Sequence, residues 1–259
     1  MKIIHLSLAL LLSVSQPASA QQARFINNGS IEYEKTVNVY ALIKEGQLLV
    51  KKPAGNEQQL FEQYQKTQQQ FTVLKSTLQF SDNKTLFVPG GPETSPAASF
   101  GILMAAQNNT VYTNLLAGTQ VIQKSIFDET FLLNDSIRSI RWKITDETRE
   151  IAGYTCRRAN ALILDSIYVV AFYAEQIHVP GGPESFAGLP GMILQVALPH
   201  EHVVWRAVKV METVIPAGAM LPPKRGKPTS HQQLINMLLE AGKNRNPQAA
   251  RLILKVNLL

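Results

Sequence analysis

Strand-length segments joined by short connections run through most of this chain, and they constrain its fold more than any other feature. Residues 131–144 are expected to form one half-buried antiparallel strand, because apolar and basic residues alternate from Ile140 to Ile144. Connections as brief as Asp165–Ser166 indicate successive hairpins. A strand pair is predicted over residues 29–49, and further strands are predicted over residues 108–116, 151–164, 167–177, 192–198 and 203–210. The series predicts an antiparallel sheet.

Helical patterns interrupt this series early in the chain and again near its end. Residues 57–75 are rich in Gln and place apolar residues at helical intervals, although the stretch TVLKSTLQF at their end has the composition of a strand. Thr229 or Ser230 can cap a second helix that Gly242 ends. Residues 251–259 fit a helix or a strand. The predicted fold class is mainly β (α+β), with an inserted helix and C-terminal helical segments.

The first twenty residues have the pattern of a secretory signal. Lys2 precedes an apolar run over residues 6–14, and an A-x-A site follows at Ala18–Ala20. That run is shorter than the roughly 20 residues of a membrane-spanning helix, and no later run reaches this length. We therefore expect residues 1–20 to be removed and the protein to be exported to the periplasm or cell envelope, without being an integral membrane protein.

A single cysteine limits how the fold can be stabilised. Cys156 has no partner for an intramolecular disulfide, so the remaining chain must be held together by packing. The composition, 45% apolar and 17% charged, is that of a globular protein. Cys156 lies in an apolar, strand-like context, which favours a buried core side chain over a reactive thiol.

Positive charge is concentrated at the C-terminal end. Residues 217–259 hold seven basic residues and one acidic residue, a net charge of +6, whereas residues 21–216 carry −1. We divide the chain after the signal into a β-rich domain, 21–215, and a basic Pro/Gly linker with a helical extension, 216–259. The extension is either a solvated tail or a contact for an anionic membrane surface. Nucleic acid is not an expected partner, because basic and aromatic residues are not interleaved.

Gly and Pro occupy seven of the twelve positions in the segment 180–191. Pro183 restricts the preceding Gly182 to extended conformations. Residues 189–192 fit a type II turn, with Pro190 at the second position and Gly191 at the third, where φ is positive. The turn does not explain the length of this loop or its aromatic residue, Phe186. That side chain is either a plug in the protein's own core or an anchor for a partner.

The hexamer VPGGPE occurs twice, at residues 88–93 and 179–184. Two copies do not make a repeat protein. They predict two loops of similar geometry at the same end of the sheet.

Three short segments of the sequence closely resemble motifs of the GLPGLI family, which comprises exported proteins of Bacteroidetes-type bacteria. They are RWKITDETREI at 141–151, IAGYTCRRA at 151–159 and GLPGMIL at 188–194. Met192 stands where the family motif has Leu, and Phe172 where Trp is usual. The resemblance implies a single curved antiparallel sheet similar to the half-barrel of lipoprotein carriers, and it implies no molecular function. The structural positions that it marks are Trp142, Gly153, Tyr154, Cys156, Gly182 and Pro183.

Sequence motifs of known chemistry are absent, so an enzyme is not favoured. The sequence contains no G-x-S-x-G elbow, phosphate-binding loop or H-E-x-x-H pair. His200 and His202 are spaced to share a metal ion on a strand, and His178 could join them across a hairpin. Pro199 places the pair in a turn, where exposed polar residues are common.

Two functions of different class remain, ahead of a third, a hydrolase for which the sequence offers no nucleophile. The first is a non-catalytic exported binding or envelope accessory protein, with no cofactor, whose curved sheet offers a groove to a hydrophobic ligand or an envelope protein. The 180–191 loop would gate this groove. The second is a metal-binding or metal-dependent envelope protein that uses the His cluster. The candidate ligand or partner contacts of the first are Phe186, Gly188, Leu189, Pro190 and Gly191.

Overall fold

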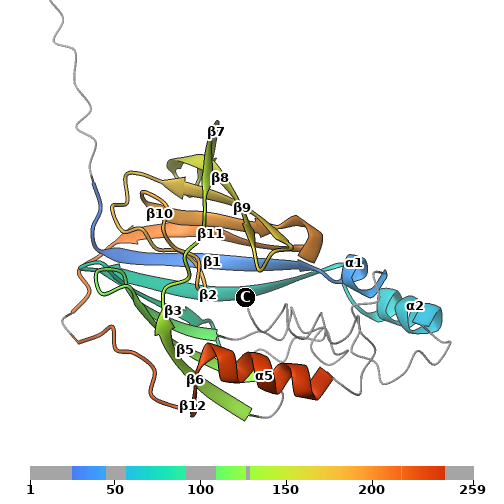
Figure 1. Ribbon diagram of the computed structural model, residues 1–259. Helices are drawn as coiled ribbons and strands as arrows, with labels where there is room; N and C mark the ends of the chain where they lie inside the picture. The colour runs from blue at the N-terminus through green and yellow to red at the C-terminus, as the bar shows by residue number, and fades with distance from the viewer. Residues whose placement is uncertain (1–24, 45–56, 92–108, 127–128, 217, 243–259) are drawn as a thin grey trace, which may run out of the picture.

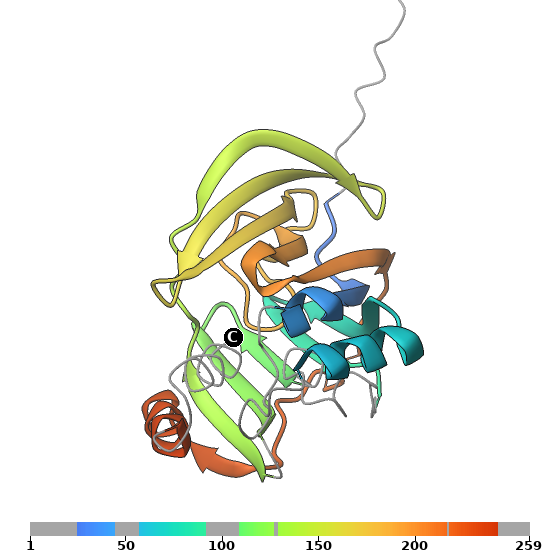
Figure 2. The same cartoon turned by 90° about the vertical axis from the view of Figure 1, so that its right-hand side faces the viewer.

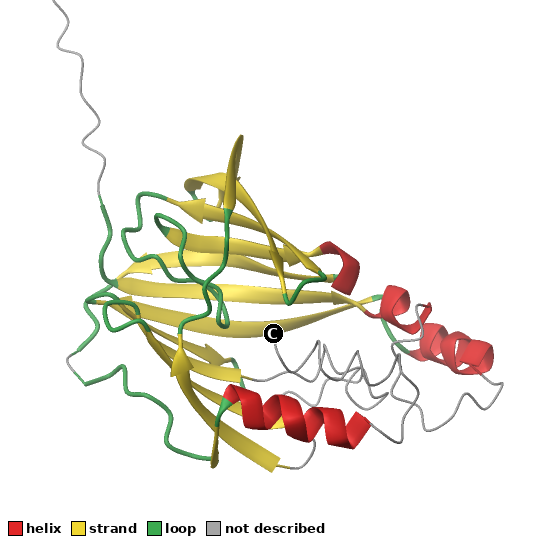
Figure 3. Ribbon diagram, viewed as in Figure 1, coloured by secondary structure: helices red, strands yellow, loops and turns green. Residues whose placement is uncertain are grey.

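A single curved, open sheet of twelve strands forms the protein (Figures 1 and 3). The computed structural model describes residues 25–44, 57–91, 109–126, 129–216 and 218–242. In spatial order the strands run β12-β6-β5-β4-β3-β2-β1-β11-β10-β9-β8-β7. Their bounds are β1 Gly29–Asn38, β2 Phe71–Ser81, β3 Lys84–Pro89, β4 Asn109–Asn114, β5 Thr119–Ile126, β6 Glu129–Ser136, β7 Lys143–Ile151, β8 Tyr154–Ile163, β9 Ile167–Ala174, β10 Met192–Leu198, β11 Val203–Glu212 and β12 Lys227–Thr229. The prediction of a mainly β fold built on one curved sheet is confirmed.

The sheet is antiparallel except at one edge, where β12 pairs with β6 in parallel. The described helices are α1 (Val39–Lys44), α2 (Glu57–Thr67), the 3₁₀ turn η1 (Pro199–Glu201) and α5 (His231–Gly242). None of the described helices is both long and apolar enough to cross a membrane.

The first strand lies at the centre of the sheet and shows how the core is built. In β1 every second side chain, Ile31, Tyr33, Lys35 and Val37, is buried on the inner face. The Tyr33 hydroxyl donates a hydrogen bond of 2.6 Å to the Ile193 carbonyl, which joins β1 to β10 across the interior. Figure 2 shows the sheet curving around this interior.

Two of the predicted strands end earlier than their sequence patterns indicate. In place of the strand pair expected over 29–49, a single strand stops at Asn38, whose side chain accepts a hydrogen bond from the Ala41 amide as α1 begins. The strand expected over 131–144 is wrong, because residues 137–142 lie in no strand. The reason is topological: β6 lies near one edge of the sheet and β7 is the other edge, so this segment must cross between them (Figure 2).

Part of the basic segment 216–259 pairs with the sheet. Its residues 227–229 form β12, and α5 packs Leu234 and Leu238 against Phe131 and Leu133 of β6. The predicted helix start is confirmed: the Ser230 hydroxyl accepts a hydrogen bond from the Gln233 amide, and the Gln233 side chain accepts one from the Ser230 amide. Residues 251–259 lie outside the described part of the chain.

Candidate functional site

The loop between β9 and β10 folds back onto the inner face of the sheet. Within it the Gly188 amide donates to the Pro180 carbonyl at 3.0 Å, and the Ile193 amide donates to the Gly181 carbonyl at 2.8 Å. A Cβ added at Gly181 would lie 2.7 Å from Thr85 Cγ2 of β3, so the loop backbone rests directly on that strand. The density of Gly and Pro in this segment therefore reflects close packing on the sheet.

The turn at the end of the loop differs from the predicted type II turn. The Gly191 amide donates to the Leu189 carbonyl at 2.8 Å, which is the three-residue hydrogen bond of a γ-turn around Pro190. The Met192 amide, which a type II turn would direct to Leu189, instead donates to the Ile177 carbonyl at 3.0 Å. Gly191 is needed for space: a Cβ there would lie 2.2 Å from the Ala174 carbonyl oxygen of β9.

The two large apolar side chains of the loop are buried in the core. Phe186 is 2% exposed and Leu189 is 1% exposed. The Phe186 ring lies 6.2 Å from the ring of Trp205 on β11, measured between centroids. Phe186 was considered either as a plug in the protein's own core or as an anchor for a partner, and in the structure its side chain is packed in the core.

Residues 137–142, which cross between β6 and β7, contact the 180–191 loop on the side away from β3. The Trp142 indole donates a 3.0 Å hydrogen bond to the Ala187 carbonyl, and a Cβ at Gly188 would lie 3.8 Å from the same indole nitrogen. A Cβ at Gly182 would lie 2.8 Å from Ile193 Cβ, and the Pro183 carbonyl accepts a bond from the Phe186 amide at 3.2 Å. Motif residues far apart in the sequence thus meet around one loop.

The remaining motif residues, Gly153, Tyr154 and Cys156, belong to the β7–β8 hairpin. Gly153 sits in its turn with φ +84, and the Cys156 side chain is fully buried, as predicted. Burial raises the pKa of the Cys156 thiol to about 12. At neutral pH this thiol is therefore protonated, which agrees with a structural role.

The structure does not bring the three candidate histidines together. His178 stacks on Phe25 before β10 begins, whereas His200 and His202 follow its last residue. Seven residues of extended strand separate the two ends of β10, a distance of roughly 20 Å. Within the described ranges no group of three or more His, Cys, Asp and Glu side chains is placed to hold a metal ion.

A small cavity lies where the 180–191 loop meets the sheet. Its volume is about 20 Å³, enough for one water-sized group. Both VPGGPE segments contribute to its wall, the first through Pro89 and the second through Glu184. The lining residues are Lys35, Leu74, Lys75, Ser76, Phe87, Pro89, Asn109, Glu184 and Trp205.

Lys35 is the most unusual residue of this cavity. It projects from the inner face of β1, between Leu74 of β2 and Trp205 of β11, and is only 3% exposed. Its ammonium lies 4.9 Å from the centre of the Trp205 ring but makes no hydrogen bond to any residue that the structure describes. Burial lowers the pKa of Lys35 to about 8, and the nearby Glu184 opposes that shift. Lys35 is therefore mostly protonated at pH 7.

Glu184 supplies the opposite charge from the loop side. Its backbone is left-handed, with φ 52, a conformation uncommon for a residue other than Gly or Asn. Its carboxylate accepts a 3.0 Å hydrogen bond from the Asn109 side chain of β4. Burial raises the pKa of Glu184, whereas Lys35, Asn109, Lys124 and Trp205 act to lower it. The loop is thus held so that a buried carboxyl group faces buried lysines.

Three further polar atoms around the cavity lack hydrogen-bond partners in the described part of the chain. They are Ser76 Oγ, Asn109 Oδ1 and Trp205 Nε1. The Trp205 indole is close enough to act on the Glu184 carboxyl but lies outside hydrogen-bond geometry. Buried polar atoms are rarely left in this state unless water, an ion or a ligand completes them. The cavity is therefore the best candidate site that the structure offers.

Sequence reasoning missed this cluster, although one signal was present. Lys35 occupies an inward position of an alternating strand, where an apolar residue is expected after Ile31 and Tyr33. A lysine on the buried face of a strand is a polar exception that can mark a site. No comparable signal exists for Asn109 and Trp205, because the pairing of distant strands brings them to the cavity.

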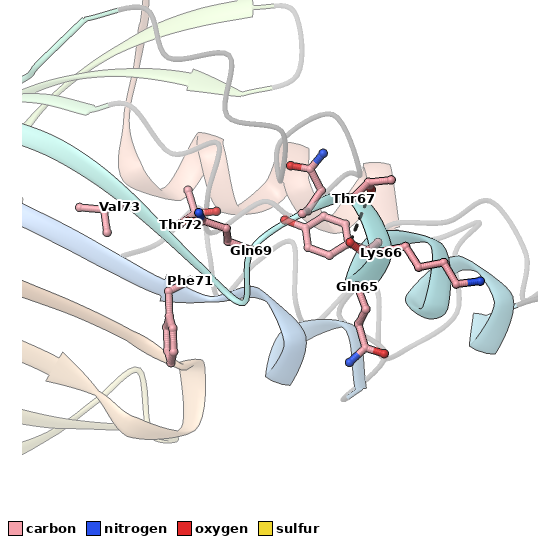
Figure 4. A pocket seen from close by; sticks show the side chains of 9 residues that line it. Gln65, Lys66, Thr67, Gln69, Phe71, Thr72 and Val73 are labelled. Carbon is pink, nitrogen blue, oxygen red and sulfur yellow. Dashed lines mark hydrogen bonds between the residues drawn. The ribbon is translucent and has the colours of Figure 1, made fainter.

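A second, larger hollow lies between the end of α2 and the start of β2 (Figure 4). Its volume is about 580 Å³, and its walls are mostly polar. Its lining residues are Tyr64, Gln65, Lys66, Thr67, Gln68, Gln69, Phe71, Thr72 and Val73. No buried charged group lines it, so it offers less specific chemistry than the cavity at Lys35.

Comparison with known families finds a match, which covers part of the region around the 180–191 loop. Residues 162–195, which run from β8 through the loop into β10, match the family Porph_ging, described as a protein of unknown function. This is an uncharacterised family associated with Bacteroidetes. A comparison with curated protein sequences finds no match.

Comparison with solved structures finds distant similarities. PNGF-II, known in two crystal forms, is 14% and 13% identical to this chain with TM-scores of 0.49 and 0.50. The alignments cover 82% and 88% of this chain, which spans only 33% of the PNGF-II chain. An uncharacterised conserved protein from Thermus thermophilus is 6% identical over 80% of this chain and 93% of its own, with a TM-score of 0.38. At this level of identity the second PNGF-II match supports the fold alone.

Proposed function

We propose that this protein is an exported, non-catalytic binding protein of the GLPGLI type, which holds a hydrophobic ligand or partner on the inner face of its curved sheet. The observation that carries the proposal is the cavity beneath the 180–191 loop, where apolar walls surround polar atoms without partners. Its apolar lining includes Leu74 and Phe87. Binding proteins commonly combine an apolar pocket with a few placed polar groups.

The loop would act as the gate. A cavity of about 20 Å³ admits only one small group, so a larger ligand enters when the loop shifts away from β3. Phe186 and Leu189 would then leave part of their core contacts and meet the ligand. The basic segment 216–259 is compatible with peripheral contact to an anionic membrane surface, although its Lys227 lies 3.9 Å from Glu129 of β6. The metal-binding alternative receives no support from the positions of the histidines.

A reversible disulfide between loop and sheet tests the gate. The Cβ of a side chain at Gly181 would lie 3.7 Å from Thr85 Cβ, close to the mean Cβ separation of a disulfide. Gly181→Cys with Thr85→Cys, in a Cys156→Ala background, should therefore lock the loop when oxidised. We expect 1-octanol, followed by calorimetry, to bind the reduced protein in a one-to-one ratio and the oxidised protein at least about tenfold more weakly.

The oxidised and reduced forms share one sequence, so each controls for the other, and the Cys156→Ala parent controls for the redox treatment. Equal affinity in both forms would show that the loop does not gate the site. If neither the parent nor the wild-type protein binds octanol, the proposed function itself is wrong.

A further inference from the structure

We infer that the cavity at Lys35 is a binding site for the carboxylate end of an amphipathic ligand, such as a medium- or long-chain fatty acid. This inference rests on the proposed function and specifies its ligand. Three observations carry it: the donors that converge on the cavity, the charges around it, and the size of the space.

The first observation is the chemistry of the groups without partners. The Lys35 ammonium and the Trp205 indole N–H can only donate hydrogen bonds, and the Ser76 hydroxyl can donate one. A carboxylate only accepts hydrogen bonds, so one carboxylate complements all three. Asn109 Oδ1 is the one acceptor in the set, and it lies on the Glu184 side, where Asn109 Nδ2 bonds the Glu184 carboxylate.

The second observation is the arrangement of charge. Lys35 and Lys124 both lower the pKa of the buried Glu184 carboxyl group. Both lysines are nearly inaccessible, with exposures of 3% and 5%. Burying a charge is unfavourable unless an opposite charge or hydrogen bonds compensate it. Lys35 Nζ has no hydrogen bond within the described residues, so a carboxylate brought by the ligand would add the compensation that Lys35 lacks.

The third observation is the size and polarity of the cavity. A space of about 20 Å³ suits one small head group. Leu74, Phe87 and Pro89 line the same space and provide apolar surface next to the head group. The site therefore fits a carboxylate joined directly to an apolar chain.

Two probes of equal length separate the head-group site from the proposed function. Octanoate and 1-octanol carry the same chain length, but only octanoate is charged at pH 7. We expect calorimetry to show that the wild-type protein binds octanoate at least about tenfold more tightly than 1-octanol. Lys35→Met, which keeps an unbranched apolar side chain, should remove this preference, so that the ratio of the octanoate and 1-octanol affinities falls to about one.

Lys209→Met is the matched control, because Lys209 lies on β11 beside β1, is exposed and does not line the cavity. We expect it to retain the octanoate preference. Thermal unfolding provides a second readout. Lys35→Met removes one partner of the buried Lys35–Glu184 charge pair, so the midpoint of the unliganded variant should fall, and octanoate should raise the midpoint of the wild-type protein more than that of the variant.

The outcomes are distinguishable. Equal binding of octanoate and octanol by the wild-type protein overturns the head-group site and leaves the binding function standing. A preference that survives in Lys35→Met overturns the role of Lys35, as does an equal rise of both midpoints with octanoate. Failure of the wild-type protein to bind either probe overturns the proposed function together with this inference.

Discussion

Phe186→Ala is expected to lower the free energy of unfolding by about 4 kcal/mol, because truncating a buried phenylalanine removes apolar contacts and leaves a cavity. Phe186 is 2% exposed and contacts the core beside Trp205. The loss should appear in denaturant unfolding as a lower midpoint with little change in slope.

Phe71→Ala is the control for this prediction. Phe71 is 49% exposed at the start of β2, so the same truncation should change the stability by no more than about 0.5 kcal/mol. Equal effects of the two substitutions would contradict the placement of Phe186 in the core.

Gly191→Val is expected to lower the free energy of unfolding by about 3 kcal/mol, because overpacking next to a fixed backbone forces the strands apart. A Cβ at this position would lie 2.2 Å from the Ala174 carbonyl oxygen and 2.8 Å from the Ala174 carbonyl carbon. Ala174 is paired with Met192 in the β9–β10 ladder, so the neighbouring backbone cannot move without breaking that pairing.

Gly118→Ala separates this steric effect from simple backbone strain. Gly118 has φ +67, and a Cβ there would meet no atom within 4 Å. Its substitution should therefore lower the stability by about 1 kcal/mol, the strain of a left-handed residue alone. A similar loss in both variants, measured by chemical denaturation, would show that the contact with Ala174 is not the reason for Gly191.

Local patterns were sufficient to predict about half of the strands, and they gave no strand at β3, β5 or β12. β10 and β11 follow from alternating or continuous apolar segments between turn residues, and the helix after Ser230 follows from its cap. The same kind of pattern failed between Ser136 and Lys143. There, Ile140 and Trp142 alternate with polar residues although the backbone crosses the sheet and pairs with no strand. Alternating apolar and polar residues indicate only that one side of an extended segment is buried. A segment that crosses a core without pairing to a strand also has one buried side.

The candidate site was less predictable because long-range pairing assembles it. The register between β1 and β11 places Lys35 opposite Trp205, 170 positions later in the chain. Glu184 reaches the cluster through a loop whose Gly and Pro content is visible in the sequence, but whose docking surface on β3 is not encoded locally. The Gly and Pro content of this loop correctly indicates its structural importance. The sequence explains Gly191 by a positive φ in a type II turn, whereas in the structure the lack of space for a Cβ beside Ala174 requires a glycine.

A crystal structure of the wild-type protein with octanoate tests the central claim most directly. The account predicts a carboxylate oxygen of octanoate in the cavity beneath the 180–191 loop, within hydrogen-bond distance, about 3 Å, of Lys35 Nζ. It also predicts that Trp205 Nε1 or Ser76 Oγ donates to the same carboxylate. Octanoate bound elsewhere, with only water at Lys35, would contradict the account.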